Sequence, residues 1–314
     1  MPPQTMRALI QPTPNSTTDN LLLTTHPIPS PNHSQNEHLI RLIPCPDVAG
    51  VVISAPPTSP FPPGTEVYAR TNYTRPGNAR DYTIATTDEL ASKPARLGWV
   101  QAAAVPVSAQ TAWQILFVHA GVVPPKHWMD ISGAREAWRG KRVLVTGASG
   151  GVGAWVVQVA RVLGVEVVGT CGSDNVELVE GLGAKEVLDY RVTRLRDWVG
   201  EDEARQVDVV VDCVGRKSLQ DAWWTVKEGG TVLSIFQPPG QVRPEGLGRS
   251  VKEVFFVMQP SGEQLEQISR LIDDGKCRGM VDSVWPLEKF HEAFKRLDTG
   301  HSRGKVVFDL FLDQ

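Results

Sequence analysis

The sequence predicts a two-domain α/β protein, in which a mostly β part is followed by a doubly wound parallel sheet. Of the 24 prolines, 19 lie in the first 125 residues, where short β-branched runs alternate with turn clusters. From Lys141 onward, short apolar runs are separated by segments of helical length, a pattern typical of parallel sheets. The length of 314 residues also favours two domains.

The N-terminal part is expected to be an irregular set of strands. Its run "HLIRLIPCPDVAGVVI" predicts a strand, a Pro-Cys-Pro break and a second strand, with Cys45 beside Asp47 at the break. The chain has four cysteines, which lie far apart without a CxxC pair or a nearby His cluster. We therefore expect buried, unreactive thiols and no zinc site.

The second part is expected to alternate strands and helices. Its predicted strands are "RVLVT", "EVVGT", "EVLD", "VDVVVD", "TVLSI" and "EVFFV". A helix is expected to begin at Ser261, which has capping-box spacing to Gln264, and to end at Gly275. Another is expected within "WPLEKFHEAFKRLDTG", whereas "VVPPKHWMDISGAREAWRG" is expected to be a surface excursion.

Charge and hydropathy favour a small-molecule ligand. The 32 basic and 35 acidic residues give a net charge of −3 without long like-charge runs, which argues against nucleic-acid or anionic-membrane partners. The first residues lack the pattern of a signal peptide, and no run approaches the roughly 18 apolar residues of a membrane span. We expect a cytoplasmic protein.

A glycine-rich loop predicts a dinucleotide site. In "VLVTGASGGVGAWVVQVARVLG", Gly147, Gly150, Gly151 and Gly153 lie between a predicted buried strand and an apolar helix. Without Cβ atoms, such a turn brings backbone N–H groups against a pyrophosphate, and the helix N-terminus adds partial positive charge. A second strand beginning at Glu166 completes the pattern. The alternative is a tight strand-to-helix turn without a ligand.

The end of that second strand favours NADP(H) over NAD(H). An NAD site usually offers a carboxylate to the ribose hydroxyls there, but this chain has "GTCGSDN". Ser173, Asn175 and the Tyr190 hydroxyl are candidates to hydrogen-bond a 2′-phosphate, with Arg191 as a cation. Asp174 leaves two interpretations open, because it is either a solvated loop acid or an inward-pointing charge that repels the phosphate.

The chain resembles the medium-chain dehydrogenase/reductase superfamily, in its zinc-free quinone oxidoreductase and enoyl reductase branch. The resemblance covers nearly the whole length and rests on "DVAGVV", "GTEVYA", "AAAVPVSAQTAW", "VLVTGASGGVG", "GAKEVLDYR", "VDVVVDCVG", "EGGTVLSI" and "RGKVVF". "TCGSDN" and "LDY" are also similar to NADPH-dependent, trans-acting enoyl reductases that serve polyketide synthases. The resemblance implies a GroES-like, mostly β domain over 1–118 and 281–314, and a Rossmann NADP(H)-binding domain over 119–280.

The resemblance also implies roles for matching positions, each of which has a core or turn role as its alternative. Thr111 would lie near the nicotinamide carboxamide, and the pyrophosphate would be held by Ser149, Gly150, Gly151, Val152 and Gly153. The 2′-phosphate would be bound by Ser173, Asn175 and Tyr190, and the adenosine ribose would lie beside Val214 and Gly215. The surroundings of the nicotinamide would be formed by Ile235, Phe236, Phe256, Lys305 and Val306.

The activity implied is zinc-independent, NADPH-dependent reduction of an activated C=C bond or a quinone, with a polyketide-type or quinone intermediate as substrate. Zinc-dependent relatives have a Gly-His pair where this chain has Cys45 and Pro46, and their structural-zinc lobe is reduced here to "TNYTRPGNARDYT". Reduction of an enone makes an enolate that needs a proton from water or a positioned acid. Tyr73 is the candidate acid and Tyr68 the second; their alternatives are a substrate-wall aromatic and a core residue. A homodimer is also implied by the resemblance.

The chain departs from the family between Leu42 and Pro44, where relatives have a loop and a helix that form part of the active-site wall. Two alternatives follow from this shortening. One is a non-redox enzyme, a cyclase or isomerase of a biosynthetic intermediate, on the same fold. The other is a non-catalytic NADP(H)-binding protein. Asp47 matches the acid of a structural turn in the family, and Cys45 is expected to pack at the join.

Overall fold

The computed structural model describes residues 4–10, 20–41, 46–75, 77–120 and 131–312. The chain divides into two compact units: unit 1 comprises Met1–Gln110 and Gln259–Gln314, and unit 2 comprises Thr111–Met258. The domain borders expected from the sequence, at 118/119 and 280/281, stay predictions. Cys45 and the shortened join after Leu42 lie outside the described residues.

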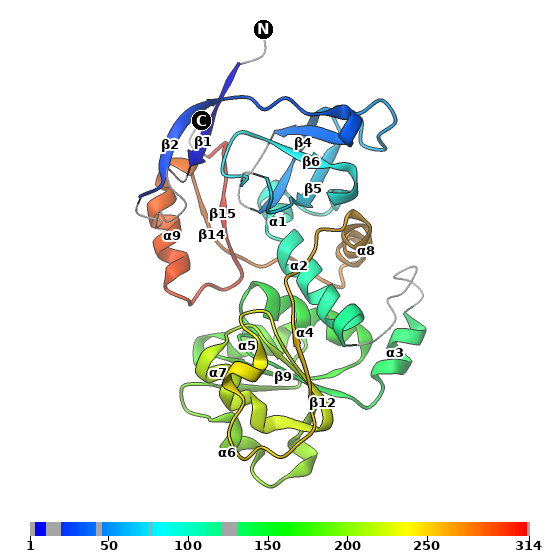
Figure 1. Cartoon of the computed structure of the whole chain (residues 1–314), viewed down its shortest axis with the longest axis vertical. Coiled ribbons are helices and arrows are strands. Elements are labelled where there is room, and N and C mark those ends of the chain that lie inside the picture. The colour runs from blue at the N-terminus through cyan, green and yellow to red at the C-terminus, as the bar shows by residue number, and fades with distance from the viewer. Residues whose placement is uncertain (1–3, 11–19, 42–45, 76, 121–130, 313–314) are drawn as a thin grey trace. The chain divides into compact units, whose positions relative to one another are not determined.

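Unit 2 contains a parallel sheet of six strands in the order β10-β9-β8-β11-β12-β13. Its strands β9 and β12 are labelled in Figure 1. The order reverses between β8 and β11, as in a doubly wound fold, so the predicted Rossmann sheet is confirmed. All six strands lie within or overlap the predicted apolar runs. They are β8 (Arg142–Val145), β9 (Glu166–Cys171), β10 (Glu186–Asp189), β11 (Val207–Asp212), β12 (Val226–Ser234) and β13 (Lys252–Phe255).

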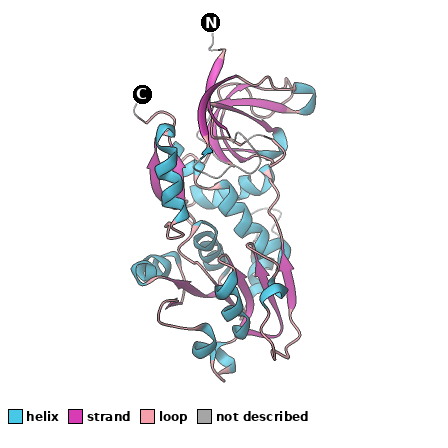
Figure 2. Cartoon of the chain, turned by 60° about the vertical axis from the view of Figure 1, so that its left-hand side comes forward, coloured by secondary structure: helices cyan, strands magenta, loops and turns pink. Residues whose placement is uncertain are grey.

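Helices connect the strands of unit 2 (Figure 2). The longest, α4, begins directly after the glycine loop and ends at Gly164, which adopts a left-handed φ of 76°. The α-helices are α3 (Ser132–Trp138), α4 (Gly151–Leu163), α5 (Val176–Leu182), α6 (Leu195–Val199) and α7 (Arg216–Ala222). Shorter helical turns are η4 (Gln114–His119), η5 (Ser173–Asn175), η6 (Glu203–Arg205), η7 (Trp223–Thr225) and η8 (Pro239–Val242).

The predicted surface excursion over 122–140 is described from residue 131 onward. The described end of the predicted surface excursion folds into α3, and its Trp138 side chain is buried. The other residues of α3 apart from Ala134 are exposed, so most of this helix faces solvent.

Unit 1 is mostly β, as predicted. A five-stranded antiparallel sheet has the order β6-β3-β4-β5-β7, and an antiparallel pair and a parallel pair accompany it. The sheet strands are β3 (Glu37–Arg41), β4 (Asp47–Ser54), β5 (Glu66–Arg70), β6 (Tyr82–Thr86) and β7 (Leu90–Ser92). The pairs are β1 (Thr5–Ile10) with β2 (Leu22–Pro27), and β14 (Val281–Trp285) with β15 (Lys305–Phe308).

The helices of unit 1 include the predicted one at Ser261. The hydroxyl of Ser261 accepts the Gln264 N–H at 3.2 Å, and the helix ends two residues before Gly275. The α-helices are α1 (Trp99–Ala103), α8 (Gly262–Asp273) and α9 (Phe290–Asp298), and α2 (Pro106–Trp113) contains the border between the units. Short turns are η2 (His33–Gln35), η3 (Thr87–Glu89) and η9 (Leu287–Lys289).

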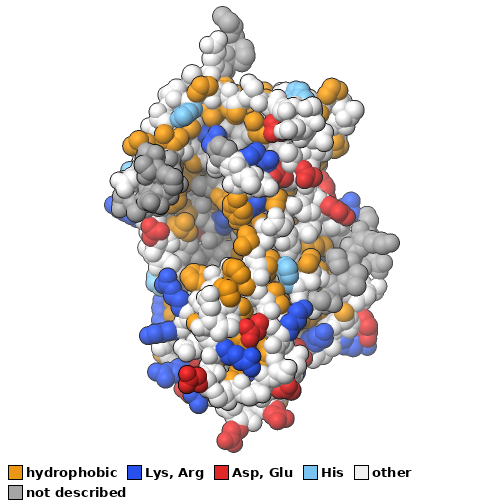
Figure 3. Space-filling view, in the orientation of Figure 1, with side chains coloured by type: hydrophobic (Ala, Val, Ile, Leu, Met, Phe, Trp, Pro, Cys, Tyr) orange, Lys and Arg blue, Asp and Glu red, His pale blue; other side chains and the backbone are white. Residues whose placement is uncertain are grey.

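Charged side chains of both signs are interspersed over the face of unit 2 seen in Figure 3. Over the stretches of chain that the structure describes, no helix combines the length and the apolar character needed to cross a membrane.

Candidate functional site

The glycine loop of unit 2 is fixed to the sheet on both sides. The Thr146 N–H donates to the Val211 carbonyl at 3.0 Å, and the Ala148 N–H donates to the Thr170 carbonyl at 2.9 Å. These bonds tie the loop to β11 and β9, which flank β8 in the sheet. The loop is therefore held at the carboxyl end of the strands, where open α/β sheets bind their ligands.

Glycine is required where the loop meets α4. A Cβ atom on Gly153 would lie 2.3 Å from the Gly147 carbonyl oxygen, a distance that no real contact allows. Helix α4 begins after Gly150, and its first backbone bond runs from the Ala154 N–H to the Gly150 carbonyl at 3.0 Å. The N–H groups of its first turn thus have no acceptor within the helix. They form a suitable binding place for an anionic group such as a pyrophosphate.

A buried aspartate collects donors at the same end of the sheet. Asp212 ends β11, and its side chain accepts the hydroxyls of Thr146 and Ser234, each at 2.7 Å. It also accepts the backbone N–H of Gly215 at 2.9 Å. The three side chains are completely buried. Asp212 therefore joins the ends of β8, β11 and β12 through a single carboxylate.

This carboxylate also orders residues that the resemblance places at the cofactor. Gly215 has a φ of 75°, and a Cβ atom there would lie 2.1 Å from Cδ1 of Phe236. The Phe236 N–H donates to the Ser234 hydroxyl at 3.1 Å, and the Ile235 N–H donates to the Asp212 carbonyl at 3.1 Å. Half of the Phe236 side chain, 49%, is exposed. The structure thus brings Gly215, Ile235 and Phe236 together, and a Cβ atom on Gly147 would touch the exposed Val214 beside them.

The candidate 2′-phosphate residues gather at the ends of β9 and β10. Arg191 Nη1 donates to the Ser173 hydroxyl at 3.2 Å, and Tyr190 is 52% exposed beside it. The Oδ1 atom of Asn175 is buried without a hydrogen-bond partner. Asp174 is exposed and has an interaction of its own. A cation, a hydroxyl and an amide oxygen therefore surround one short turn.

Thr111 and Phe256 are the remaining cofactor candidates of unit 2. Thr111 is buried in α2. Phe256 stacks on His119 with ring centroids 3.9 Å apart, and burial lowers the pKa of His119, with the charge of Lys252 lowering it further. His119 is therefore a neutral ring at neutral pH.

In unit 1 the two candidate tyrosines occupy opposite environments. Tyr73 is 62% exposed, and its ring lies over the guanidinium of buried Arg70, with Cζ 3.4 Å from the ring centroid. Tyr68 is fully buried; its hydroxyl bonds the Leu265 carbonyl at 2.9 Å and the Ser269 hydroxyl at 2.8 Å, and burial raises its pKa. Tyr68 is a core residue, so the idea that it supplies a proton was wrong.

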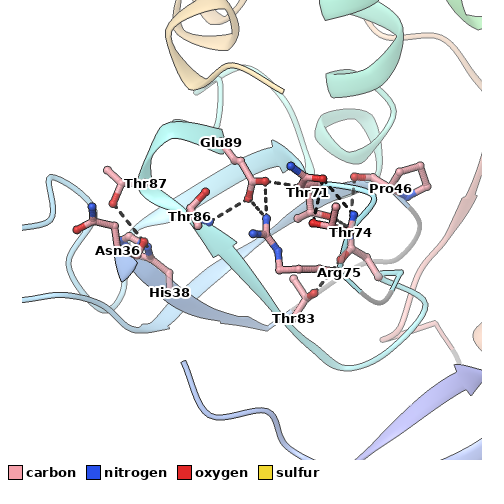
Figure 4. A network of polar contacts seen from close by, with 12 residues as sticks. Asn36, His38, Pro46, Thr71, Thr74, Arg75, Thr83, Thr86, Thr87 and Glu89 are labelled. Carbon is pink, nitrogen blue, oxygen red and sulfur yellow. Dashed lines mark hydrogen bonds and ion pairs between the residues drawn. The ribbon is translucent and has the colours of Figure 1, made fainter. Parts of the chain in front are cut away.

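The loop that carries Tyr73 is anchored by a polar network (Figure 4). The buried Glu89 carboxylate accepts the backbone N–H of Asn72 at 2.8 Å and pairs with the Arg75 guanidinium. Asn78 closes the other side, donating from Nδ2 to the Thr71 hydroxyl at 2.8 Å. The loop is therefore anchored by a backbone N–H just before Tyr73 and by the Arg75 side chain just after it.

Lys305 and Val306, the remaining candidates, lie on β15 in unit 1. Lys305 Nζ forms an ion pair with Asp47 Oδ2 at 2.7 Å, and the other Asp47 oxygen accepts the Val107 N–H. Val306 packs partly buried against the hydrophobic core of the unit. The structure thus gives Lys305 a defined partner within its own unit.

The thiols that the structure describes are free, and two of the three are buried. Burial raises the pKa of Cys171 to about 11. Across the described ranges, no three or more His, Cys, Asp and Glu side chains come together in a group able to hold a metal ion.

Asp212 and Arg70 are functional candidates that sequence reasoning missed. Asp212 had a signal, because an aspartate at the end of the apolar run "VDVVVD" needs partners when it is buried. Arg70 had one too, since it ends a strand whose preceding residues Val67, Tyr68 and Ala69 are all apolar in character and buried.

Comparisons with known proteins agree on the fold. Residues 182–308 match a family described as zinc-binding dehydrogenase. A probable zinc-binding oxidoreductase, mitochondrial, of Arthroderma benhamiae is 44% identical over 97% of both chains. A mitochondrial NAD(P)H oxidoreductase of Mus musculus is 29% identical over 84% of this chain and 69% of its own. The solved quinone oxidoreductase of Coxiella burnetii superposes with a TM-score of 0.82 at 23% identity, over 98% of this chain and 99% of that one.

Proposed function

Because the chain belongs to the quinone oxidoreductase-like branch of the medium-chain dehydrogenase/reductase superfamily, we propose that it is an NADPH-dependent reductase of an activated C=C bond or a quinone. The observation that carries this proposal is the fit of unit 2 to a dinucleotide. The space between Gly153 and Gly147 leaves no room for a side chain, and the first turn of α4 offers N–H groups to a pyrophosphate.

The preference for NADPH is supported by the turn after β9. Arg191 is held against Ser173, and no carboxylate ends β9 where an NAD site usually has one. A guanidinium and a hydroxyl suit a phosphate monoester, because charge-assisted hydrogen bonds from arginine are among the strongest that proteins make. The 2′-phosphate is the group that distinguishes NADPH from NADH.

In this reaction, bound NADPH supplies the hydride from its nicotinamide ring to an electrophilic carbon. The residues around Asp212 hold the backbone that carries Val214, Gly215, Ile235 and Phe236 in place for the cofactor. Tyr73, exposed at the end of an anchored loop, is the group we assign as the proton donor to the reduced substrate.

We propose that no zinc takes part. In the described chain, the acids, histidines and cysteines do not converge in groups of three or more, and zinc needs three or four ligands. The name of the Arthroderma protein includes zinc binding, which concerns that protein. Metal analysis of the purified chain tests this point, and one zinc per chain that survives dialysis against a chelator would overturn it.

The reductase proposal is tested by following NADPH absorbance with enones, enoyl thioesters and quinones. We expect substrate-dependent loss of NADPH for at least one class and slower loss of NADH. Tight NADPH binding without oxidation by any class would contradict the proposal. Product formation from a biosynthetic intermediate without NADPH consumption would instead favour a cyclase or isomerase.

We also propose a homodimer formed through the edge of the sheet in unit 2. Strand β13 is an edge strand, and Phe255 and Val257 are exposed on or just after it. Such an edge readily pairs with another strand. Light scattering of the wild type and of Val254→Pro, which cannot donate at that position, tests the proposal; a monomeric wild type would contradict it.

The cellular location stays a prediction. Composition and sequence favour the cytoplasm, whereas both relatives named above are called mitochondrial. Imaging of the full chain with a fluorescent protein fused to its C-terminus distinguishes the two compartments.

A further inference from the structure

Arg70 is a buried arginine with unused hydrogen-bond donors. It ends β5, its side chain is 1% exposed, and its Nε and Nη2 atoms have no hydrogen-bond partner. Desolvation by burial lowers its pKa. A buried guanidinium with unpaired N–H groups is costly, because the hydration that it loses is not replaced. A group in this state is well suited to receive an oxygen atom from a ligand.

The carboxylates near Arg70 do not supply that oxygen. Asp47 lies opposite Arg70 in the ladder between β4 and β5, but its two oxygens are bound by Lys305 and by the Val107 N–H. Glu89 is bound by Arg75 and by two backbone N–H groups. Both acids stabilise the charge of Arg70 at a distance and leave its N–H groups unused.

The ring above Arg70 belongs to Tyr73, the most exposed of the described tyrosines. Tyr73 lies 3.4 Å from the guanidinium carbon and is nevertheless 62% exposed. Glu89 anchors the loop that carries it, through the backbone N–H of Asn72 and the side chain of Arg75. An exposed side chain therefore covers one face of the Arg70 guanidinium.

We propose that Arg70 binds the carbonyl oxygen of the substrate and that Tyr73 lies beside the same oxygen-bearing group. The ligand class is a neutral α,β-unsaturated carbonyl compound or a quinone, and the inference rests on the proposed function. When the β-carbon accepts a hydride, the π electrons move to the carbonyl oxygen and make an enolate. Arg70 N–H groups stabilise that negative oxygen. The Tyr73 hydroxyl then gives its proton to the α-carbon of a reduced enone or to the negative oxygen of a reduced quinone, and its phenolate takes a proton from water.

The inference is tested first by binding, without turnover. The probe is 4-nitrophenolate, an aromatic oxyanion that mimics an enolate. It is not turned over, because NADP⁺ carries no hydride to transfer. It is titrated into the full chain with saturating NADP⁺ and followed by its visible absorption. We expect Arg70→Met to weaken its binding by at least about tenfold, because a charge-assisted hydrogen bond is lost. NADP⁺ affinity should stay within about twofold, because no contact of unit 2 is changed.

The matched control is Arg80→Met. Arg80 is another partly buried arginine of unit 1 with an unpartnered Nε, and desolvation lowers its pKa as well. We expect its 4-nitrophenolate affinity to stay within about twofold of the wild type, because it lacks the Tyr73 contact. Equal loss in both variants would show a general charge effect and overturn the assignment. Unchanged affinity in Arg70→Met would overturn it too.

Arg70→Lys keeps the test decisive if Arg70→Met does not fold. Lysine retains the charge but not the planar fork, so we expect a loss of at least about threefold in probe affinity and in kcat/KM. Wild-type values for both would overturn the inference. If the wild type reduces no enone or quinone yet probe binding depends on Arg70, the proposed function fails and the oxyanion site stands. If reduction occurs but neither Arg70 variant alters it, the proposed function stands and the assignment of Arg70 fails.

Discussion

The hydroxyl of Thr146 donates to Oδ1 of Asp212 over 2.7 Å, and both side chains are completely buried. This bond joins the ends of β8 and β11, the two strands at which the sheet order reverses. Asp212→Asn leaves one acceptor oxygen where the carboxylate has two and places an NH₂ group against donors. We expect a loss of about 2–3 kcal/mol in the free energy of unfolding and of at least about tenfold in NADPH affinity.

The measurements are urea unfolding and titration of NADPH fluorescence. Asp208→Asn is the control, because Asp208 lies on the same strand but accepts from the Arg142 N–H and pairs with Lys227 away from the loop. It should lose about 1 kcal/mol of stability and no NADPH affinity. Wild-type NADPH affinity in a folded Asp212→Asn would contradict the role given to this carboxylate.

Gly153→Ala tests the close approach of loop and helix. The added methyl group would lie 2.3 Å from the Gly147 carbonyl oxygen, so the loop must move. We expect NADPH affinity to fall by at least about tenfold and stability by about 1–3 kcal/mol. Gly181→Ala is the control: it lies inside α5 with open space around it, and should gain about 0.5–1 kcal/mol with unchanged affinity. Equal affinities in the two variants would count against the pyrophosphate site.

Arg191→Ala tests the cofactor preference. Loss of the guanidinium beside Ser173 removes the only cation that we assign to the 2′-phosphate. The Kd for NADPH should rise by about 10- to 100-fold, which corresponds to one charge-assisted hydrogen bond. NADH, which lacks the phosphate, serves as the internal control and should bind as it does to the wild type. An equal loss of affinity for NADPH and NADH would show that Arg191 does not bind the 2′-phosphate.

The two tyrosines should separate stability from turnover. Tyr68→Phe removes a buried hydroxyl that bonds Leu265 and Ser269. The free energy of unfolding should therefore fall by about 1–2 kcal/mol, while kcat is unchanged. Tyr73→Phe removes an exposed hydroxyl, so stability should change by less than about 0.5 kcal/mol. Its kcat should fall at least about tenfold. Thermal unfolding and steady-state kinetics measure both, and an unchanged kcat in Tyr73→Phe would leave protonation to water.

Asp282 gives a pH dependence with a defined sign. Its hydrogen bond from Arg296 lowers the pKa of the carboxyl in the folded state. A lowered folded pKa stabilises the protein at pH values above the ordinary Asp pKa, and this contribution disappears as the pH falls through the folded value. Asp282→Asn should therefore lower the free energy of unfolding at pH 7, and the difference from wild type should shrink on acidification. Urea unfolding across that range checks it, and a constant difference would contradict the sign.

The central strands of unit 2, β8 and β11, could be predicted because they are short apolar runs buried on both faces, as at Val143 and Val210. Helix α8 could be predicted because its N-cap and stop are local features of the sequence. The contacts at Asp212 could not, since Thr146 and Ser234 are 66 and 22 residues away and meet only when three strands are aligned. Arg70 was missed for the same reason: its unused N–H groups follow from partners that Asp47 and Glu89 have already found.

The hydrogen bond between Arg191 and Ser173 shares no atom with the network around Asp212. Under the proposed function, recognition of the cofactor divides into two separable modules, a rigid one for the part common to all nicotinamide dinucleotides and a peripheral one for the 2′-phosphate. An engineer who wants an NADH-using form can redesign the turn at 173–175 and position 191 while leaving the sheet untouched.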